Sequence, residues 1–502
     1  MKRNFYKLLC LSLSFAMLLV MFAGCGKEPV SSPTDVPPKS VVTPLDREPV
    51  EDTTTTTISK VEASEPSSKL PTASVVSPPS SDDSPQVLLP VNPVDKIPSS
   101  TPSKEEPKPI NIVFHSIYKE QYTGNTGLGK LWKDHFGKMA EKGILTSYAN
   151  ADPDTVVDTI TKDVMAGRAS ADVFEVSLGM SHQLAVKKVL ANVLDSKTLN
   201  QKVFDNGGTH SNTINGKTYG VALSANANVM MILYNKELIQ QYAPDVDIPA
   251  LIAQNKWNYD TFRDLAKKCT VDIDGNGKID VYAIVSNPNL IQGVLFTGAG
   301  GYGVMKQGKI TSTLAYQGEG YTTLEFAKTL FKTDRTWKYF AKVDSAWQNF
   351  SMQKSAMIVL SSSEIADYAK RFPFAYGIAP IPTQNQTTAC NGVMDAQVFV
   401  VPRTRVNRLN DIGKWLNEAV KAENALLIKR TYGMHNEAVN TYQRILKNTS
   451  AEYSAGAISL EIASRVDAIV TASGGHAEKA LAAAHLLIQN QLDEFYAPLY
   501  EK

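Results

Sequence analysis

The stretch Lys256–Val285, KWNYDTFRDLAKKCTVDIDGNGKIDVYAIV, decides the fold. Trp257, Phe262 and Leu265 recur at roughly helical spacing in its first part, an Asp/Gly-rich centre follows, and the β-rich segment VYAIV closes it. The pattern therefore predicts a helix, a tight loop and a strand in direct succession.

The centre of this stretch is a candidate cation-binding loop. Oxygen-bearing side chains alternate around Gly277, which is how a short loop wraps a hard cation such as calcium. The twelfth position, where an EF-hand has a bidentate glutamate, is Ala283, so water or another carboxylate would have to complete the site. The alternative is a solvated turn that binds nothing. A structural calcium ion is the one cofactor suggested, and none is required. The candidate metal-binding residues are Asp272, Asp274, Asn276, Lys278 and Asp280.

The N-terminus has the pattern of a secretory signal. Three basic residues within positions 1–7 precede an apolar run over residues 8–22, which is too short for a retained membrane span. The sequence Phe22-Ala-Gly-Cys25 resembles a bacterial lipobox, which implies cleavage after residue 24 and lipidation of Cys25. Several acyl chains, palmitate among them, would then hold the protein on the extracytoplasmic face of a bacterial cell membrane. The alternative is ordinary cleavage and free secretion.

Cleavage after residue 24 changes the net charge of the protein. Removing residues 1–24 takes away three positive charges, which leaves 48 Lys and Arg against 50 Asp and Glu and a net charge of −2. No basic field for nucleic acid remains.

Residues 25–108 are rich in Pro, Ser, Thr and Val, with TTTTT at 53–57, and predict a disordered tether behind Cys25. A mucin-like glycosylated stalk is the alternative.

The remaining residues, 109–502, are too many for one small core and suit two lobes. Strand-like and helix-like segments alternate in the order β-α-β-α-β from residue 110 to 176, which predicts a parallel sheet with covering helices and an α/β fold. Apolar residues at helical spacing recur near the C-terminus, and there we interpret Trp415 as a core residue.

Five segments carry a recognisable series of motifs: Ala171-Asp172-Val173, Asn215–Lys236, the opening stretch, Phe350–Met357 and Tyr376–Pro382. In their order they resemble the extracellular solute-binding proteins of ABC importers, the group that contains maltose-binding protein. The resemblance covers nearly all of residues 109–500 and departs from the family pattern at Ala171 (usually Pro), Leu223 (near the usual Pro) and Gln353 (usually Gly).

This resemblance implies a two-lobed, type II periplasmic-binding-protein-like fold with about three crossings between the lobes. Lobe one would hold 109–222 and 365–423, and lobe two 228–360 and 428–500. The implied function is a monomeric, membrane-tethered receptor that closes by a hinge on a sugar or oligosaccharide and delivers it to the membrane subunits of an ABC permease. Such a receptor is not an enzyme.

Candidate ligand-binding residues follow from the strand ends that would face the interlobe cleft. A sugar needs hydroxyl, amide and carboxylate partners, because each hydroxyl buried without one costs ~1–3 kcal/mol. Where maltose-binding relatives place aromatic platforms, this chain has Val176-Ser177 and Ser361–Ser363, so three other aromatic residues are candidates that could equally be core. The candidates are His115, Ser116, Tyr118, Ser177, Ser224, Asn226, Tyr302, Trp347, Ser361, Ser362, Glu364 and Asp395.

Motifs of other protein classes are missing or incomplete. The chain has no HExxH, GxSxG or CxxC, and the P-loop-like Gly124–Leu131 lacks the hydroxyl that would hold magnesium. An extracellular carbohydrate-active enzyme, or a sensor coupled to a membrane kinase, is the alternative function. Cys269 and Cys390 would fall in different lobes, where a disulfide would oppose hinge motion, so we expect two buried thiols.

Overall fold

A computed structural model of the 502-residue chain describes residues 108–125, 127–287, 289–340, 342–384, 391–471 and 477–501. The signal sequence, Cys25, the tether and Cys390 lie outside these residues. The chain divides into two compact units, Met1–Ser99 and Ser100–Lys502, and every described element belongs to the second. No helix in the described part of the chain has both the length and the apolar character needed to cross a membrane.

The unit Ser100–Lys502 is built on a mixed sheet in the order β10-β7-β11-β6-β13-β3-β1-β2, with β12 also paired to β6 and β14 to β13. Two short hairpins, β4-β5 and β8-β9, stand apart from it. The strands are β1 (Ile110–Ser116), β2 (Ile144–Asn150), β3 (Val173–Ser177), β4 (Thr213–Ile214), β5 (Lys217–Thr218), β6 (Gly220–Asn235), β7 (Tyr282–Ser286), β8 (Gly303–Lys306), β9 (Lys309–Ser312), β10 (Trp337–Tyr339), β11 (Ser355–Ser361), β12 (Tyr376–Pro380), β13 (Asn391–Val400) and β14 (Thr449–Ser450).

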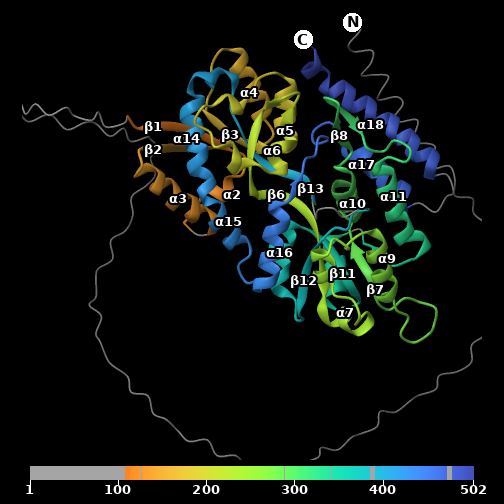
Figure 1. The fold of residues 1–502 in the computed structure, drawn as a ribbon. Helices are drawn as coiled ribbons and strands as arrows, with labels where there is room; N and C mark the ends of the chain where they lie inside the picture. The colour runs from red at the N-terminus through yellow and green to blue at the C-terminus, as the bar shows by residue number, and fades with distance from the viewer. Residues whose placement is uncertain are drawn as a thin grey trace, which may run out of the picture. The chain divides into compact units, whose positions relative to one another are not determined.

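The long strand β6 joins two halves of this sheet, as Figure 1 shows. In the first half, β1 pairs in parallel with both β2 and β3, which confirms the predicted β-α-β-α-β order. β13 pairs antiparallel with both β3 and β6 and connects this half to the crossing strand. In the second half, the end of β6 pairs with β11, and β7 lies beyond β11.

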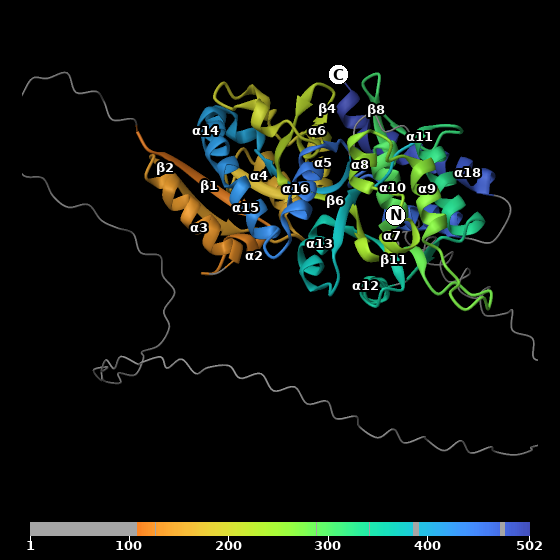
Figure 2. The ribbon, with the colours of Figure 1, turned by 60° about the horizontal axis from the view of Figure 1, so that its bottom comes forward.

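Helices pack around both halves (Figures 1 and 2). Those that contact first-half strands include α3, α5, α6 and α14, whereas α7, α12 and α16 contact strands of the second half. The longer helices are α3 (Gly127–Ala140), α4 (Val156–Met165), α5 (Leu178–Val186), α7 (Lys236–Tyr242), α9 (Tyr259–Lys268), α10 (Asn289–Ala299), α11 (Glu319–Lys328), α12 (Val343–Ser351), α13 (Ser362–Tyr368), α14 (Leu409–Ala419), α15 (Glu423–Arg430), α16 (Asn436–Lys447), α17 (Leu460–Thr471) and α18 (Ala477–Tyr500); short ones are α2 (Lys119–Tyr122), α6 (Gly207–Ser211) and α8 (Ile248–Ala253).

The opening stretch folds as its pattern predicts. Asn258 caps α9 by accepting a hydrogen bond from the Thr261 amide at 3.1 Å, and the two side chains form a capping box. The Trp257 indole is fully buried and donates to the Pro380 carbonyl at 2.8 Å, which ties the start of α9 to β12. Helix, loop and strand therefore belong to the second half of the sheet.

The division of the chain between the halves differs from the expected one around β12. We expected residues 365–423 in lobe one, but β12 pairs antiparallel with the second half of β6, over Met231–Asn235. This segment remains in the second half because the edge of β6 opposite β11 is open there, and β12 fills it. The chain returns to the first half only with β13.

The C-terminal helix α18 contacts both halves rather than the second half alone. Gln489 accepts a hydrogen bond from the Ser312 amide of β9 at 2.8 Å, while the Leu499 carbonyl accepts one from the Asn215 side chain, beside β4, at 3.1 Å. The Tyr496 hydroxyl lies 2.8 Å from Nδ1 of His182 in α5. The last helix therefore bridges the two halves on one side.

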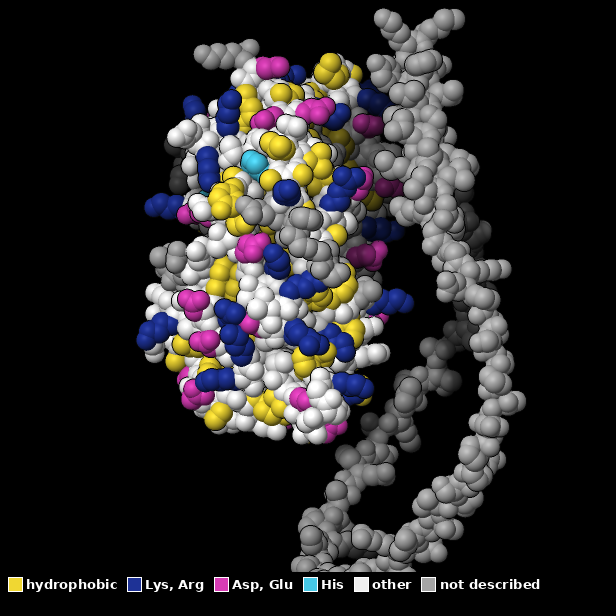
Figure 3. All heavy atoms as spheres, turned by 90° about the vertical axis from the view of Figure 1, so that its right-hand side faces the viewer, with side chains coloured by type: hydrophobic (Ala, Val, Ile, Leu, Met, Phe, Trp, Pro, Cys, Tyr) yellow, Lys and Arg dark blue, Asp and Glu magenta, His cyan; other side chains and the backbone are white. Residues whose placement is uncertain are grey.

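Trp415 is a core residue, as predicted. It is fully buried, its indole N–H donates to Thr146 of β2 at 2.9 Å, and its ring packs on Phe114 and Phe399. Cys269 is a buried free thiol, which agrees with the expectation for this cysteine. Basic and acidic side chains are interspersed on the face drawn in Figure 3.

Replacing Trp415 with alanine should lower the free energy of unfolding by about 3–5 kcal/mol, because it removes a large side chain that packs against β1, β2 and β13. Urea denaturation would measure this loss. Lys414→Ala, on the exposed side of the same helix, should change the free energy by less than about 0.5 kcal/mol. Equal losses in the two variants would contradict the core assignment.

Candidate functional site

A cleft of about 360 Å³ lies where β6 and β13 cross between the two halves of the sheet. This volume is in the range of ~300–1,000 Å³ that is usual for small-molecule sites. The residues that line it are Tyr118, Gln121, Asn226, Ala227, Asn228, Ser362, Ser363, Ala366, Asp367, Asp395, Ala396, Gln397 and Arg430.

Two walls of the cleft come from the carboxyl ends of strands, where open α/β sheets generally bind ligands. β1 ends at Ser116, whose hydroxyl accepts a hydrogen bond from the Tyr118 amide at 2.9 Å and so fixes the turn that carries the tyrosine. β11 ends at Ser361, and α13 begins with Ser362. The first wall therefore belongs to one half of the sheet and the second wall to the other.

The floor of the cleft is an interruption in the β6-β13 ladder. Ala396 pairs with Ala227, but the next paired residue of β13, Val398, faces Ala222. Residues 223–226 of β6 therefore lie opposite Gln397 alone. Such irregularities redirect side chains and are common next to binding sites. Here the interruption frees Asn226 and Gln397 to line the cleft.

Asp395 supplies a carboxylate at a second irregularity of β13. Its Oδ1 accepts hydrogen bonds from the amides of Leu178 at 3.0 Å and Ala396 at 2.9 Å. Burial raises its pKa despite these two bonds. The pKa of Tyr118 is also raised, by its own burial and by the charges of Asp395 and Glu175. The Tyr118 hydroxyl is therefore a neutral hydrogen-bonding group next to an acceptor.

Arg430 fixes the orientation of the Asn226 amide. Its Nη2 donates to Asn226 Oδ1 at 2.9 Å, and its Nη1 donates to the Ala225 carbonyl. Because a guanidinium only donates, the oxygen of Asn226 must face it. The amide nitrogen Nδ2 therefore points away from Arg430, where it can donate to another group.

Three side-chain atoms of the cleft are buried and have no hydrogen-bond partner within the described part of the protein. They are Nδ2 of Asn226 and the Oε1 atoms of Gln121 and Gln397. A buried polar atom without a partner costs about 1–3 kcal/mol, so each favours a ligand that would pair with it. One donor and two acceptors of this kind suit a molecule with several hydroxyl groups.

Glu175 lies behind the cleft on β3. It is fully buried and accepts a hydrogen bond from the Ser116 hydroxyl at 2.7 Å. Burial raises its pKa to about 7, although the hydroxyls of Ser116 and Tyr122 and the charge of Arg430 oppose the shift. Near neutral pH Glu175 is therefore only partly ionised, and it lies behind the site without lining it.

Four of the twelve candidate ligand-binding residues line the cleft: Tyr118, Asn226, Ser362 and Asp395. Ser116 supports Tyr118 from below. The sequence patterns missed other lining residues, because their position depends on the ladder interruption and on the ends of α2, α13 and α15. The polar residues missed are Gln121, Asn228, Ser363, Asp367, Gln397 and Arg430.

The other candidates have local structural roles outside the cleft. Ser177 accepts the Met180 amide as the N-cap of α5, and Glu364 forms a capping box with Ser361 at the start of α13. The Trp347 ring packs on Tyr368 at 5.5 Å.

Three further candidates also lie away from the lining. Tyr302 is buried in the core. His115 makes an edge contact with Phe174, and burial lowers its pKa. Ser224 lies half-buried within the interrupted part of β6.

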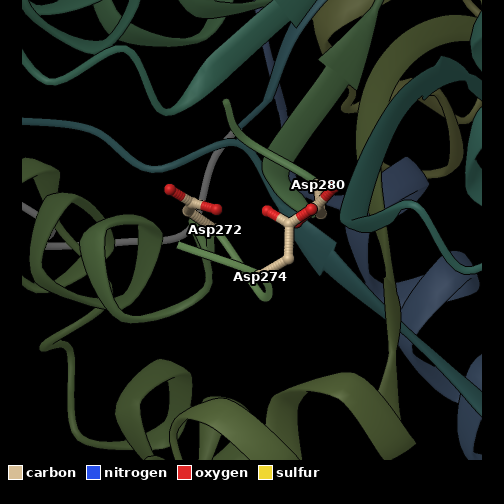
Figure 4. Close-up of side chains that lie close together, drawn as sticks. All are labelled: Asp272, Asp274 and Asp280. Atoms are coloured by element: carbon tan, nitrogen blue, oxygen red, sulfur yellow. The ribbon is translucent and has the colours of Figure 1, made fainter. Parts of the chain in front are cut away.

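The Asp/Gly-rich loop gathers three of its five candidate metal-binding residues. Oxygens of Asp272, Asp274 and Asp280 lie within 4.8 Å of one another (Figure 4). The loop is closed by the bridge between Val271 and Val281. Of the other two candidates, Asn276 is bound within the loop, because its Oδ1 accepts the Lys278 amide at 2.8 Å and its Nδ2 donates to Asp274, whereas Lys278 is exposed. Ala283 is buried in β7, so the loop itself offers no twelfth ligand.

The raised pKa of Glu175 predicts a pH-dependent stability. A carboxyl with a pKa of about 7 when folded and 4.5 when unfolded binds more protons in the folded state between these values. Its contribution is therefore complete below pH 4.5 and is lost as the pH rises toward 7. Glu175→Gln cannot titrate, so its advantage over the wild type in urea unfolding should grow across this window and then level off. Glu452 and Asp467, also with pKa values of about 7, titrate in both proteins and cancel. Parallel pH curves would refute the assignment.

Comparisons with known proteins agree with this architecture. The binding protein for cyclic α-maltosyl-1,6-maltose from Arthrobacter globiformis is 15% identical, with a TM-score of 0.58 over 77% of this chain and 100% of that chain. MalE, a sugar-binding protein from Xanthomonas citri, is 13% identical, with a TM-score of 0.59 over 78% of this chain and 100% of its own. The galacto-N-biose-/lacto-N-biose I-binding protein of an ABC transporter from Bifidobacterium longum is 15% identical, with a TM-score of 0.54 over 78% and 99%.

These likenesses confirm the predicted fold, the two-lobed α/β fold of periplasmic binding proteins. No curated protein matches the chain. A sequence family described as bacterial extracellular solute-binding protein matches residues 132–421, more than half of the chain. The chain therefore belongs to the bacterial extracellular solute-binding proteins.

Proposed function

We propose that this protein is the solute receptor of an ABC importer and binds a small, neutral carbohydrate in the cleft at the β6-β13 crossing. The observation that carries the proposal is the set of unpaired amide atoms of Gln121, Asn226 and Gln397 around one cavity. Hydroxyl groups both donate and accept, so one sugar ring can satisfy donors and acceptors together.

The charges of the cleft favour a neutral ligand over an anionic one. Asp367 and Asp395 line it, and Glu175 lies behind it. Among the described residues of the lining Arg430 is the one cation, and two of its N–H groups already bind Ala225 and Asn226. An anionic sugar would therefore meet more negative than free positive charge.

Two similar proteins support the carbohydrate class. The Arthrobacter protein binds cyclic α-maltosyl-1,6-maltose, and the Bifidobacterium protein was solved with lacto-N-biose. Tyr118 is the one aromatic residue in the part of the lining that the structure describes, so we infer that hydrogen bonds contribute more to recognition than ring stacking does.

The remaining parts of the proposal concern the cell. We propose that Cys25 is lipidated, that residues 25–108 tether the folded unit to the outer face of the membrane, and that the monomer delivers its ligand to permease subunits without catalysis. The two lobes, corresponding to the two halves of the sheet, would close on the ligand by a hinge. A sensor that passes its signal to a membrane kinase would share these features and differ in its partner.

Isothermal titration calorimetry of the purified protein against neutral mono- and oligosaccharides, with sugar acids and sugar phosphates in parallel, tests the binding function. We expect saturable one-to-one binding of a neutral sugar that is recovered intact, and much weaker binding of its anionic analogue. Conversion of the sugar to products would show that the protein is an enzyme and not a receptor. Tighter binding of the anionic analogue would overturn the electrostatic argument.

Asp395→Asn should weaken sugar binding by about 10- to 100-fold, because hydrogen bonds to a charged group contribute about 1.5–3 kcal/mol. The same calorimetry measures the change. Asp158→Asn, at an exposed position of α4, is the matched control and should bind like the wild type. An unchanged affinity in Asp395→Asn would show that this carboxylate does not contribute to sugar binding.

Calcium binding at the Asp/Gly-rich loop remains a prediction from the sequence. If Asp272, Asp274 and Asp280 hold the ion, millimolar calcium should raise the melting temperature relative to a chelator-treated sample, since an ion bound only to the folded state stabilises it. Asp274→Asn should remove most of this rise, whereas Asp264→Asn on α9 should not. Identical melting curves with calcium and with chelator would show that the loop is a solvated turn.

A further inference from the structure

Helix α15 holds the strand β6 at the point where it leaves its ladder with β13. The amide of Ala225 donates to Glu423 Oε1 at 2.9 Å, and the Ala225 carbonyl accepts from Arg430 Nη1. Both backbone groups of one residue are therefore bound by side chains of α15. We call this pair, Glu423 and Arg430, the α15 clamp.

The clamp is built from the two ends of one helix. Glu423 is the first residue of α15 and Arg430 the last, and seven positions are close to two full turns, so the two side chains share a face about 10 Å apart along the axis. The buried residues Leu426 and Leu427 anchor the helix between them. A rigid helix of this length sets the position of Ala225 from two points.

A different set of contacts holds β6 immediately after the clamp. The Ser362 hydroxyl accepts from the Val229 amide at 3.3 Å and lies 3.2 Å from the Ala227 carbonyl, to which it donates. The Tyr442 hydroxyl of α16 donates to the Ser362 carbonyl at 2.9 Å. Because α16 packs on β12 in the second half, this set attaches residues 227–229 to that half.

The α15 clamp belongs instead to the first half, since α15 packs on α3 and α3 packs on β2. The contacts of β6 with α15 of the first half therefore end at Asn226, and its contacts with Ser362 of the second half begin at Ala227, where pairing with β13 also resumes. Asn226 and Ala227 both line the cleft, and Arg430 also binds Asn226. We infer that Glu423 and Arg430 are positioning residues that fix where β6 bends, and that they set the balance between open and closed arrangements of the two lobes.

Glu423 gives the cleaner test because, unlike Arg430, it does not line the cleft. Glu423→Ala leaves the Ala225 amide without its acceptor, whereas Glu423→Gln keeps an oxygen in place. Asn424→Ala changes the neighbouring, exposed residue of the same helix and is the matched control. Thermal unfolding shows whether each variant is folded. If Glu423→Ala does not fold, Arg430→Lys is measured in its place.

The measurement is the distance distribution between spin labels at Lys138 on α3 and Asp264 on α9, both exposed, in the ligand-free protein with its native cysteines replaced. We expect Glu423→Ala to shift this distribution, with Glu423→Gln and Asn424→Ala close to the parent protein. An unchanged distribution in Glu423→Ala, or an equal shift in Asn424→Ala, would overturn the inference. This arm needs no ligand, so it decides the inference even if no sugar is found to bind.

A second arm rests on the proposed function. A residue that only shifts the lobe balance changes the Kd of every ligand by one common factor, here about fivefold for a loss of ~1 kcal/mol. Calorimetry of Glu423→Ala with two sugars should give the same factor for both. Factors that differ between the sugars would place Glu423 in direct contact with the ligand and would overturn its positioning role.

Discussion

The backbone groups of residues 223–226 have to find hydrogen-bond partners away from the β6-β13 ladder, and much of the site depends on how this is solved. A buried amide or carbonyl without a partner is costly, so the interruption can exist only if other groups replace the missing strand. At Ala225 the replacement is made by Glu423 and Arg430. The interruption in turn turns Asn226 and Gln397 toward the cleft.

The same arrangement explains the electrostatics of the site. Arg430 is retained at the cleft because it satisfies Ala225 and Asn226, and its charge also opposes the raised pKa of Glu175. Burial raises the pKa of Asp395, which lines the cleft, and of Glu175, which lies behind it. The charge of both carboxyl groups therefore depends on how they are buried and hydrogen-bonded. Ligand recognition and strand geometry therefore share the same few side chains.

The C-terminal helix adds a constraint of a different kind. It reaches from the β8-β9 hairpin to the β4-β5 hairpin and places Tyr496 against the buried ring of His182. His182 also contacts the carbonyls of Ser211 and Ala455, each at 2.9 Å. A movement of one half against the other would have to keep or rearrange these contacts.

The sequence by itself determined the α/β class, the β-α-β-α-β start, the buried Trp415 and the helix, loop and strand of Lys256–Val285, because these depend on local periodicity and capping. Motif order also identified the family. The sequence could also place Tyr118, Asn226, Ser362 and Asp395 near the cleft, because each lies at or near the point where a strand ends or bends.

Only the tertiary structure decided the rest. The pairing of β12 with β6 depends on an edge that no local pattern reveals, and a ladder interruption is defined by two strands about 170 residues apart in the chain. Arg430 enters the site from the end of a helix, and in the sequence it is one charged residue on an amphipathic segment. Ser177, Ser361 and Glu364 became helix caps, because a polar residue after a strand serves a helix start as readily as a ligand. Long-range packing selects between these two uses.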